Sequence, residues 1–141
     1  MSIDISPKPK NYSEAPTAEK VADVSAWLTE HKATGLVTID LAGRCAFTEA
    51  MIVVTATSVR HGQSLADGVA ALCHEKKYEY LRVDGYTVGS WILVDCNDFV
   101  VHIFQAEARD TYKLESLWSV PTSVEFQQRR AAGTEQSNNQ E

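Results

Sequence analysis

The sequence predicts a single α/β domain in which helices flank a mixed sheet of five strands. The first observation is length, since 141 residues fit one domain and are enough to bury one core. The second is patterning, because apolar residues recur at helical spacing in three segments and form short strand-like runs in five others. The third is order: helix, strand, strand, helix, strand, strand, strand and helix favour one sheet with helices packed on it.

The first expected helix begins at Pro16, because proline suits the first helical turn. Val21, Val24 and Leu28 follow at helical spacing. Gly35 then favours a stop, since glycine readily adopts the left-handed conformation that often ends a helix.

Two strands are expected next, separated by a turn over residues 41–44. Residues 36–40 form the first strand. Residues 51–55 form a near-continuous apolar run, which is typical of a strand covered on both faces. Thr57 or Ser58 then suits the N-cap of a second helix. The buried stripe of that helix comprises Leu65, Ala66, Val69, Leu72 and Cys73.

Three further strands follow the second helix. Residues 80–83 form the third strand, which ends at the turn signal Asp84-Gly85. Residues 91–95 and 99–104 form a hairpin around the short polar sequence C-N-D. Alternation along the fifth strand places Phe99, Val101 and Ile103 on one face, and Val100, His102 and Phe104 on the other.

A last helix is expected over residues 107–118, with Leu114, Leu117 and Trp118 on one side. Residues 1–15 contain few apolar side chains and predict a flexible leader. Residues 122–141 are polar and predict a disordered tail. The folded domain is therefore expected to span residues 16–121.

Composition favours a cytoplasmic protein that binds another protein. The chain is 44% apolar and 23% charged, which is ordinary for a soluble domain. No apolar run reaches the roughly 18–20 residues that cross a membrane, and the N-terminus lacks the apolar region of a secretory signal. A net charge of −6 disfavours binding to nucleic-acid phosphates. It suits a basic protein partner, since opposite charge steers encounter.

The three cysteines, residues 45, 73 and 96, are odd in number and include no C-x-x-C motif. They are therefore expected to be reduced thiols, mostly buried. The histidines do not have the spacing of metal ligands. We expect no metal and no cofactor.

One pattern resembles part of an enzyme site. Nucleotidyltransferases hold phosphate with a Gly-Ser turn and magnesium with two carboxylates on a strand, and here Gly89-Ser90 is followed by Asp95 and Asp98. Carboxylates at i and i+3 do not share a strand face. Asp95 is therefore expected at a strand end and Asp98 in the hairpin turn, with no catalytic residue.

Ser58, Arg60 and His61 form a second candidate, because residues at the start of a helix can bind an anion. The segment T-A-T-S-V-R-H lacks the glycines of a phosphate loop. A capping turn is therefore the favoured interpretation of these residues.

The residues from the fourth strand to the last helix favour a partner-binding surface, because Trp, Tyr and Arg are the usual anchors of interfaces. Each candidate also has a structural interpretation. His102 could be a half-buried histidine bonded to a neighbour, Trp91 and Trp118 could belong to the core, and Arg109 and Tyr112 could form a solvated helix face. The five candidates are Trp91, His102, Arg109, Tyr112 and Trp118.

Several stretches together resemble the ribosomal silencing factor (Iojap-related) family across about residues 17–119. They are D-L-A-G-R-C-A-F-T-E-A-M-I-V-V-T-A-T-S-V-R-H, Ala66-Asp67, Gly85, W-I-L-V-D-C-N-D-F-V-V-H-I-F and A-R-D-T-Y-K-L-E-S-L-W. The chain departs from the family pattern at Glu49-Ala50, at Ala56 and at Asn97-Asp98. These departures concern the second strand and the hairpin turn.

The resemblance implies a nucleotidyltransferase-like fold without the catalytic residues. It implies binding to the fourteenth protein of the large ribosomal subunit (the L-fourteen protein), which blocks an intersubunit bridge, prevents the subunits from joining and represses translation. It also implies a homodimer of the free protein. Two alternatives stay open: a residual nucleotidyltransferase or nucleotide-binding protein, and a dimerisation module.

Overall fold

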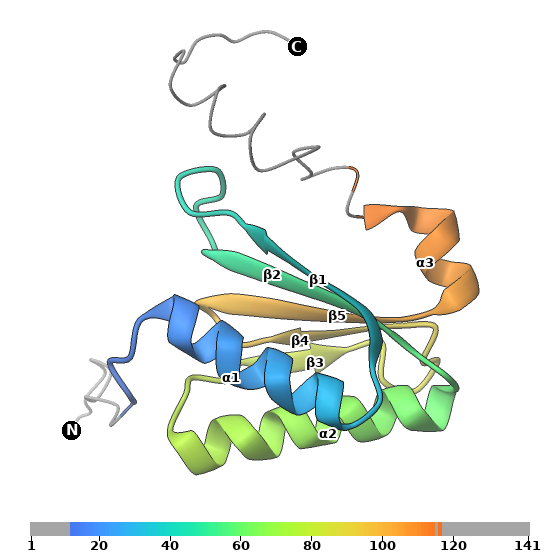
Figure 1. The fold of residues 1–141 in the computed structure, drawn as a ribbon, viewed down its shortest axis with the longest axis horizontal. Coiled ribbons are helices and arrows are strands. Elements are labelled where there is room, and N and C mark those ends of the chain that lie inside the picture. The colour runs from blue at the N-terminus through green and yellow to red at the C-terminus, as the bar shows by residue number, and fades with distance from the viewer. Residues whose placement is uncertain (1–11, 115, 117–141) are drawn as a thin grey trace, which may run out of the picture.

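The computed structural model describes residues 12–114 and residue 116 (Figure 1). Within this part, helices and strands follow in the predicted order. They are α1 (Thr17–Glu30), β1 (Thr34–Asp40), β2 (Ala50–Ala56), α2 (Val59–Lys76), β3 (Arg82–Asp84), β4 (Trp91–Asp95), β5 (Phe99–Gln105) and α3 (Ala106–Tyr112). Most of the expected leader, the end of the expected last helix and the whole expected tail lie outside the described residues.

The five strands form one mixed sheet in the order β1-β2-β5-β4-β3. β2 and β5 are parallel, whereas the other neighbouring pairs are antiparallel. α1 and α2 pack on one face of the sheet and α3 on the other, beside the end of β5 (Figure 1). The predicted single α/β domain, with a mixed five-stranded sheet flanked by helices, is confirmed.

The main core fills the space between the sheet and the two long helices. Each fully buried Leu, Val, Ile or Phe side chain there stabilises the fold by about 1.5–3 kcal/mol. The alternation predicted for β5 is confirmed, because the predicted set of three side chains faces this core. The core includes Val24, Leu28, Leu65, Val69, Cys73, Phe99, Val101 and Ile103.

A smaller second core lies on the opposite face of the sheet, under α3. Ala108 of α3 and Trp91 of β4 pack against its edge. Its buried residues are Ile39, Leu41, Met51, Val53, Phe104 and Leu114.

The helix α1 ends before Gly35, so the predicted role of Gly35 as a helix stop is wrong. Lys32 takes the left-handed conformation, with φ of 75°. The Ala33 N–H donates to the Leu28 carbonyl at 3.0 Å and closes the last turn. Gly35 instead lies in β1 with φ of 60°, where the pairing with β2 is irregular. A residue without Cβ suits this irregularity.

The helix predicted over residues 107–118 is interrupted at Lys113. α3 ends at Tyr112 because Lys113 adopts a left-handed conformation, with φ of 47°. This turn brings Leu114 onto the second core, and Leu114 and Ser116 are helical again. Leu117 and Trp118 lie outside the described residues.

The remaining differences are small. β3 begins at Arg82 rather than at residue 80, and Tyr80 packs against the main core from the preceding loop. Ser58 is the N-cap of α2, and its hydroxyl accepts the His61 N–H at 3.0 Å. Of the two predicted caps, Ser58 is therefore confirmed.

Candidate partner-binding surface

Trp91 and His102 meet on the face of the sheet that carries the second core. In the β4–β5 register Trp91 pairs with Phe104, and His102 pairs with Leu93. Trp91 and His102 are therefore diagonal neighbours, which is within reach of large side chains. The indole Nε1–H of Trp91 donates to Nδ1 of His102 at 3.0 Å.

The His102 ring is held in its neutral form. Its side chain is buried, with the residue only 6% exposed, and desolvation lowers its pKa to about 4. Because the indole of Trp91 can only donate, Nδ1 of His102 must accept, and the ring proton resides on Nε2. The ring therefore fixes the orientation of the Trp91 indole.

Three rings and the imidazole form an aromatic cluster, defined by Trp91, His102, Phe104 and Tyr112. The Trp91 ring lies 4.9 Å from the Phe104 ring and 4.8 Å from the Tyr112 ring, between centroids. Phe104 is fully buried, whereas Tyr112 is 56% exposed. The cluster therefore runs from the second core outward, with Tyr112 at the surface and a rigid base beneath it.

Phe104 was not among the candidates from the sequence. The alternation of side chains along β5 could have identified Phe104, because it placed Phe104 on the same face as His102. Its pairing with Trp91 depends on the β4–β5 register, which the pattern of either strand alone does not specify.

Arg109 lies apart from the aromatic cluster. Its Nη1 donates to the Thr55 hydroxyl at 2.9 Å, and a Cβ on Gly35 would come within 2.7 Å of the same nitrogen. Arg109 thus reaches over β2 and β1, whereas Tyr112 reaches β4. Trp118 lies outside the described residues, so three of the five candidates come together: Trp91, His102 and Tyr112.

A cavity of about 780 Å³ opens next to the cluster, with Tyr112 in its wall. It lies at the carboxyl ends of the parallel strands β2 and β5, beside the start of α3. Its polar lining is mostly neutral hydroxyl and amide groups. They include Thr34, Thr55, Thr57, Ser90, Gln105 and Thr111. Such groups can accept or donate hydrogen bonds to a polar side chain placed beside Tyr112.

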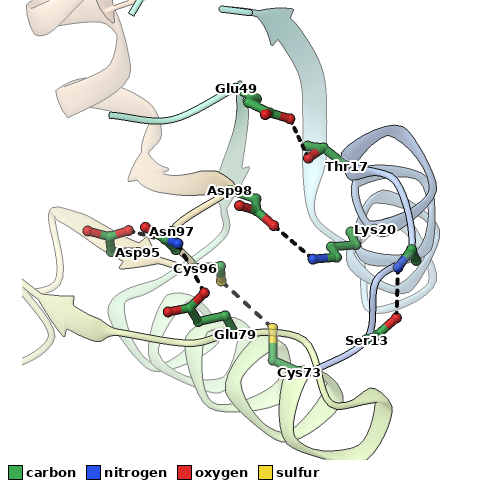
Figure 2. Close-up of polar contacts among 11 residues, drawn as sticks. Ser13, Thr17, Lys20, Glu49, Cys73, Glu79, Asp95, Cys96, Asn97 and Asp98 are labelled. Carbon is green, nitrogen blue, oxygen red and sulfur yellow. Dashed lines mark hydrogen bonds and ion pairs between the residues drawn. The ribbon is translucent and has the colours of Figure 1, made fainter. Parts of the chain in front are cut away.

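The two carboxylates of the enzyme-like pattern bind partners within the protein. Asp98 lies in the β4–β5 turn, and its Oδ2 is 2.8 Å from Nζ of Lys20, which is 4% exposed (Figure 2). Asp95 ends β4, and its Oδ1 accepts the Asn97 N–H at 2.9 Å. Its Oδ2 is 3.5 Å from Nη1 of Arg82. The two side chains occupy the places that the sequence predicted for them.

The start of α2 forms a closed capping turn. Besides the bond from its N–H to Ser58, His61 accepts the Thr57 N–H on Nδ1 at 2.9 Å. Its Nε2 lies 2.9 Å from the His31 carbonyl, to which it donates. The polar groups of Ser58 and His61 are therefore engaged in joining α2 to the end of α1.

Two searches of the described residues add to this picture. Residues 12–114 and 116 contain no group of three or more histidine, cysteine or acidic side chains arranged to hold a metal ion. In the same part of the chain, the helices are too short or too polar to span a bilayer.

The architecture is that of a single-domain α/β protein with an aromatic cluster on one sheet face, and comparison with known proteins assigns it to a family. A family model described as "Ribosomal silencing factor during starvation" matches residues 14–141. The chain belongs to this family. Membership gives it a ribosome-associated silencing role in the regulation of translation.

Individual relatives agree with the assignment. The ribosomal silencing factor of Haemophilus influenzae is 36% identical over 88 residues, which cover 62% of this chain and 86% of that protein. A mouse protein named "Mitochondrial assembly of ribosomal large subunit protein 1" is 25% identical over 96 residues, covering 66% of this chain and 42% of that protein. A crystal structure of a protein from Chromobacterium violaceum superposes with a TM-score of 0.72 at 28% identity, covering 77% of this chain and 92% of that one.

Proposed function

We propose that this protein binds the large ribosomal subunit through its L-fourteen protein, blocks an intersubunit bridge and so prevents the two subunits from joining. It acts by steric occlusion and not as an enzyme. The proposal rests on the family resemblance for the identity of the partner. The observation that supports the place of contact is the aromatic cluster of Trp91, His102, Phe104 and Tyr112.

The cluster has the physical properties of an interface centre. Tyr112 is exposed, yet its ring packs 4.8 Å from the Trp91 ring, and Trp91 is held by its bond to His102. A partner therefore meets an aromatic surface that is already ordered, and little side-chain entropy is lost on binding. Aromatic anchors surrounded by polar groups are typical of interface centres.

Charge supports a basic partner. The chain carries a net charge of −6, and Glu107 and Asp110 lie exposed on α3 close to Tyr112. Opposite charge around an apolar centre raises the rate of encounter more than it raises affinity. Arg109, whose guanidinium is bound to Thr55, is assigned to the rim of this surface.

Two further parts complete the proposal. The free protein is a homodimer, and it acts in the cytoplasm. A cytoplasmic location suits the ribosome-associated role of the family.

The test is a subunit-joining assay with a matched pair of variants. Tyr112→Ala removes the exposed ring of the cluster. Phe47→Ala removes another exposed ring, 87% exposed, from the loop between β1 and β2. The β2–β5 and β4–β5 registers place that loop and Trp91 at opposite ends of β5. Both changes remove an exposed aromatic side chain, so a general loss of apolar surface affects them equally.

We expect wild type and Phe47→Ala to bind purified large subunits and to reduce the yield of joined ribosomes in sucrose gradients. Tyr112→Ala should bind more weakly by about 2 kcal/mol, or roughly 30-fold in Kd. Unchanged joining with wild-type protein in excess would refute the silencing mechanism. Equal binding by the two variants would instead remove the aromatic cluster from the contact surface.

Arg109→Ala supplies a second comparison. Because the Arg109 side chain faces Thr55 and not the cluster, its removal should weaken binding by less than the removal of Tyr112. A loss as large as that of Tyr112→Ala, in a variant with unchanged melting temperature, would move the centre of the surface toward β1 and β2.

A further inference from the structure

We propose that Cys73 and Cys96 form an intramolecular disulfide bond when the protein meets hydrogen peroxide, and that Cys73 is the thiol that reacts first. This inference does not depend on the proposed ribosome contact. It begins from distance: the two Sγ atoms lie 3.7 Å apart (Figure 2). Both thiols are free, and both are buried in the main core.

The two sulfur atoms need to move only a short distance to form a disulfide bond. A disulfide bond is about 2.0 Å long, so the sulfur atoms must close by about 1.7 Å from their present separation of 3.7 Å. Cys73 lies in the last turns of α2. Cys96 follows the end of β4 in the turn to β5. Rotation of either side chain about its Cα–Cβ bond moves its sulfur without breaking a backbone hydrogen bond.

The surroundings favour Cys73 as the nucleophile. The hydrogen bond with Cys96 lowers the pKa of Cys73, burial opposes that shift, and the positive charge of Lys20 adds to it. The same hydrogen bond, followed by burial, raises the pKa of Cys96. Because a thiolate is the reactive form of cysteine, the pair is asymmetric, with Cys73 attacking and Cys96 resolving.

A surface cavity lies on the Cys73 side of the pair. Cys73 lines a surface cavity of about 620 Å³ between the end of α2 and the tyrosines around it. Its lining residues are Tyr12, Ala70, Cys73, His74, Lys77, Tyr78 and Tyr80. The thiol itself is fully covered, so the proposal requires hydrogen peroxide to enter when this part of the core opens locally. Oxidised glutathione is much larger and should react more slowly.

The chemistry balances with one peroxide. The Cys73 thiolate attacks one peroxide oxygen, the O–O bond breaks, and the products are a sulfenic acid on Cys73 and a hydroxide, which takes a proton to give water. The Cys96 thiol then loses its proton and attacks the Cys73 sulfur. The S–S bond forms as the S–O bond breaks, and the leaving oxygen departs as a second water. Two thiols are oxidised and one peroxide is reduced.

The bond would join two elements that are otherwise held by packing. It would tie the last turns of α2 to the β4–β5 turn and close a loop between positions 23 residues apart. Closing such a loop restricts the unfolded chain and stabilises the folded one. Oxidation should therefore give a protein with a higher melting temperature, and reduction should reverse the change.

The main experiment uses the full-length wild-type protein. Reduced protein is treated with one equivalent of hydrogen peroxide, the remaining thiols are blocked, and the digest is mapped by mass spectrometry without reduction. We expect a peptide pair that joins Cys73 to Cys96, with Cys45 blocked as a free thiol. We also expect a rise of several degrees in melting temperature that dithiothreitol removes. A pair involving Cys45, or no pair at all, would overturn the proposal.

Single variants test the order of the two steps. In Cys96→Ser, dimedone should trap a sulfenic acid on Cys73, because no resolving thiol remains. In Cys73→Ser, Cys96 should stay unmodified under the same conditions. Cys45→Ser is the matched control and should cross-link as the wild type does. If dimedone traps a sulfenic acid on Cys96 in Cys73→Ser as fast as it does on Cys73 in Cys96→Ser, the assignment of Cys73 as the nucleophile is wrong. If either variant misfolds, the peptide map of the wild-type protein still tests the disulfide itself.

Discussion

The indole N–H of Trp91 donates a 3.0 Å hydrogen bond to Nδ1 of the buried, neutral His102. This contact joins β4 to β5 through their side chains, in addition to the backbone ladder. It also holds the Trp91 ring against Phe104 and Tyr112. One hydrogen bond thus connects the second core to the surface proposed to bind the ribosome.

Trp91→Phe tests the stabilising effect of that bond. Phenylalanine keeps an aromatic ring but has no donor, so Nδ1 of the buried His102 would lose its partner. Leaving a buried acceptor unsatisfied costs about 1–3 kcal/mol. The free energy of unfolding, measured by urea denaturation, should fall by that amount. The double variant Trp91→Phe, His102→Leu removes both polar partners and should recover part of the loss. A single variant as stable as the wild type would show that the bond contributes nothing.

Acid should destabilise the protein through His102. Its folded-state pKa of about 4 lies below the ordinary 6.5, so between these values the unfolded chain binds a proton that the folded protein does not. Keeping His102 neutral in the folded protein therefore costs no stability above pH 6.5. Below pH 6.5 the free energy of unfolding decreases, and it continues to decrease until the pH reaches about 4. The total loss is on the order of 3 kcal/mol.

The measurement is urea denaturation at intervals across this range, for wild type and His102→Gln. Glutamine has no proton to gain in the window, so its curve against pH should be flatter. Acidic side chains titrate in both proteins and cancel in the difference. Parallel curves for the two proteins would show that His102 is not the group responsible.

Asp98→Asn should lower stability and leave ribosome binding unchanged. Asp98 neutralises the buried ammonium of Lys20, and an uncompensated buried charge is costly. Because Asp98 is itself 37% exposed, water replaces part of the lost interaction, and a loss of roughly 1–3 kcal/mol is expected. Asp95→Asn, whose partners are Asn97 and Arg82, should cost less.

Thermal melting and gradient binding on the same samples separate the two effects. Addition of magnesium and a nucleotide should not raise the melting temperature of wild type, since a ligand that binds only the folded state must stabilise it. A ligand-dependent rise that Asp98→Asn abolishes would favour the nucleotidyltransferase alternative.

Gly68→Ala should destabilise the contact between α1 and α2, although alanine favours helices over glycine by about 1 kcal/mol. A Cβ at position 68 would lie 1.9 Å from the Trp27 ring, so the ring or the helix must move. Overpacking of this kind typically costs about 1–3 kcal/mol. Ser64→Ala, at an exposed position one turn earlier on α2, is the control and should be neutral or slightly stabilising. A Gly68→Ala protein that melts above wild type would show that Trp27 has room to rotate.

The sequence predicted which residue types form the candidate surface better than it predicted where their side chains lie. The residue types from β4 to α3 indicated anchors, and Trp91, His102 and Tyr112 do come together. Arg109 was expected to share a helix face with Tyr112, yet it points to Thr55 on β2. A helix that crosses several strands sends side chains three residues apart to different strands, and its crossing position depends on tertiary packing.

The sequence by itself determined the order of the elements, the fold class, the two faces of β5 and the start of α2 after a cap at Thr57 or Ser58. These features depend on local propensity and on apolar periodicity, which are properties of short segments. Only the tertiary structure decided that β2 and β5 are parallel neighbours, that Lys113 ends α3 so that Leu114 is buried, and that Cys73 lies 3.7 Å from Cys96. The physical reason is that the strand pairing and the cysteine contact join segments far apart in the chain. The end of α3 depends on the balance between helix propensity and the burial of Leu114. One segment of sequence alone contains neither kind of information.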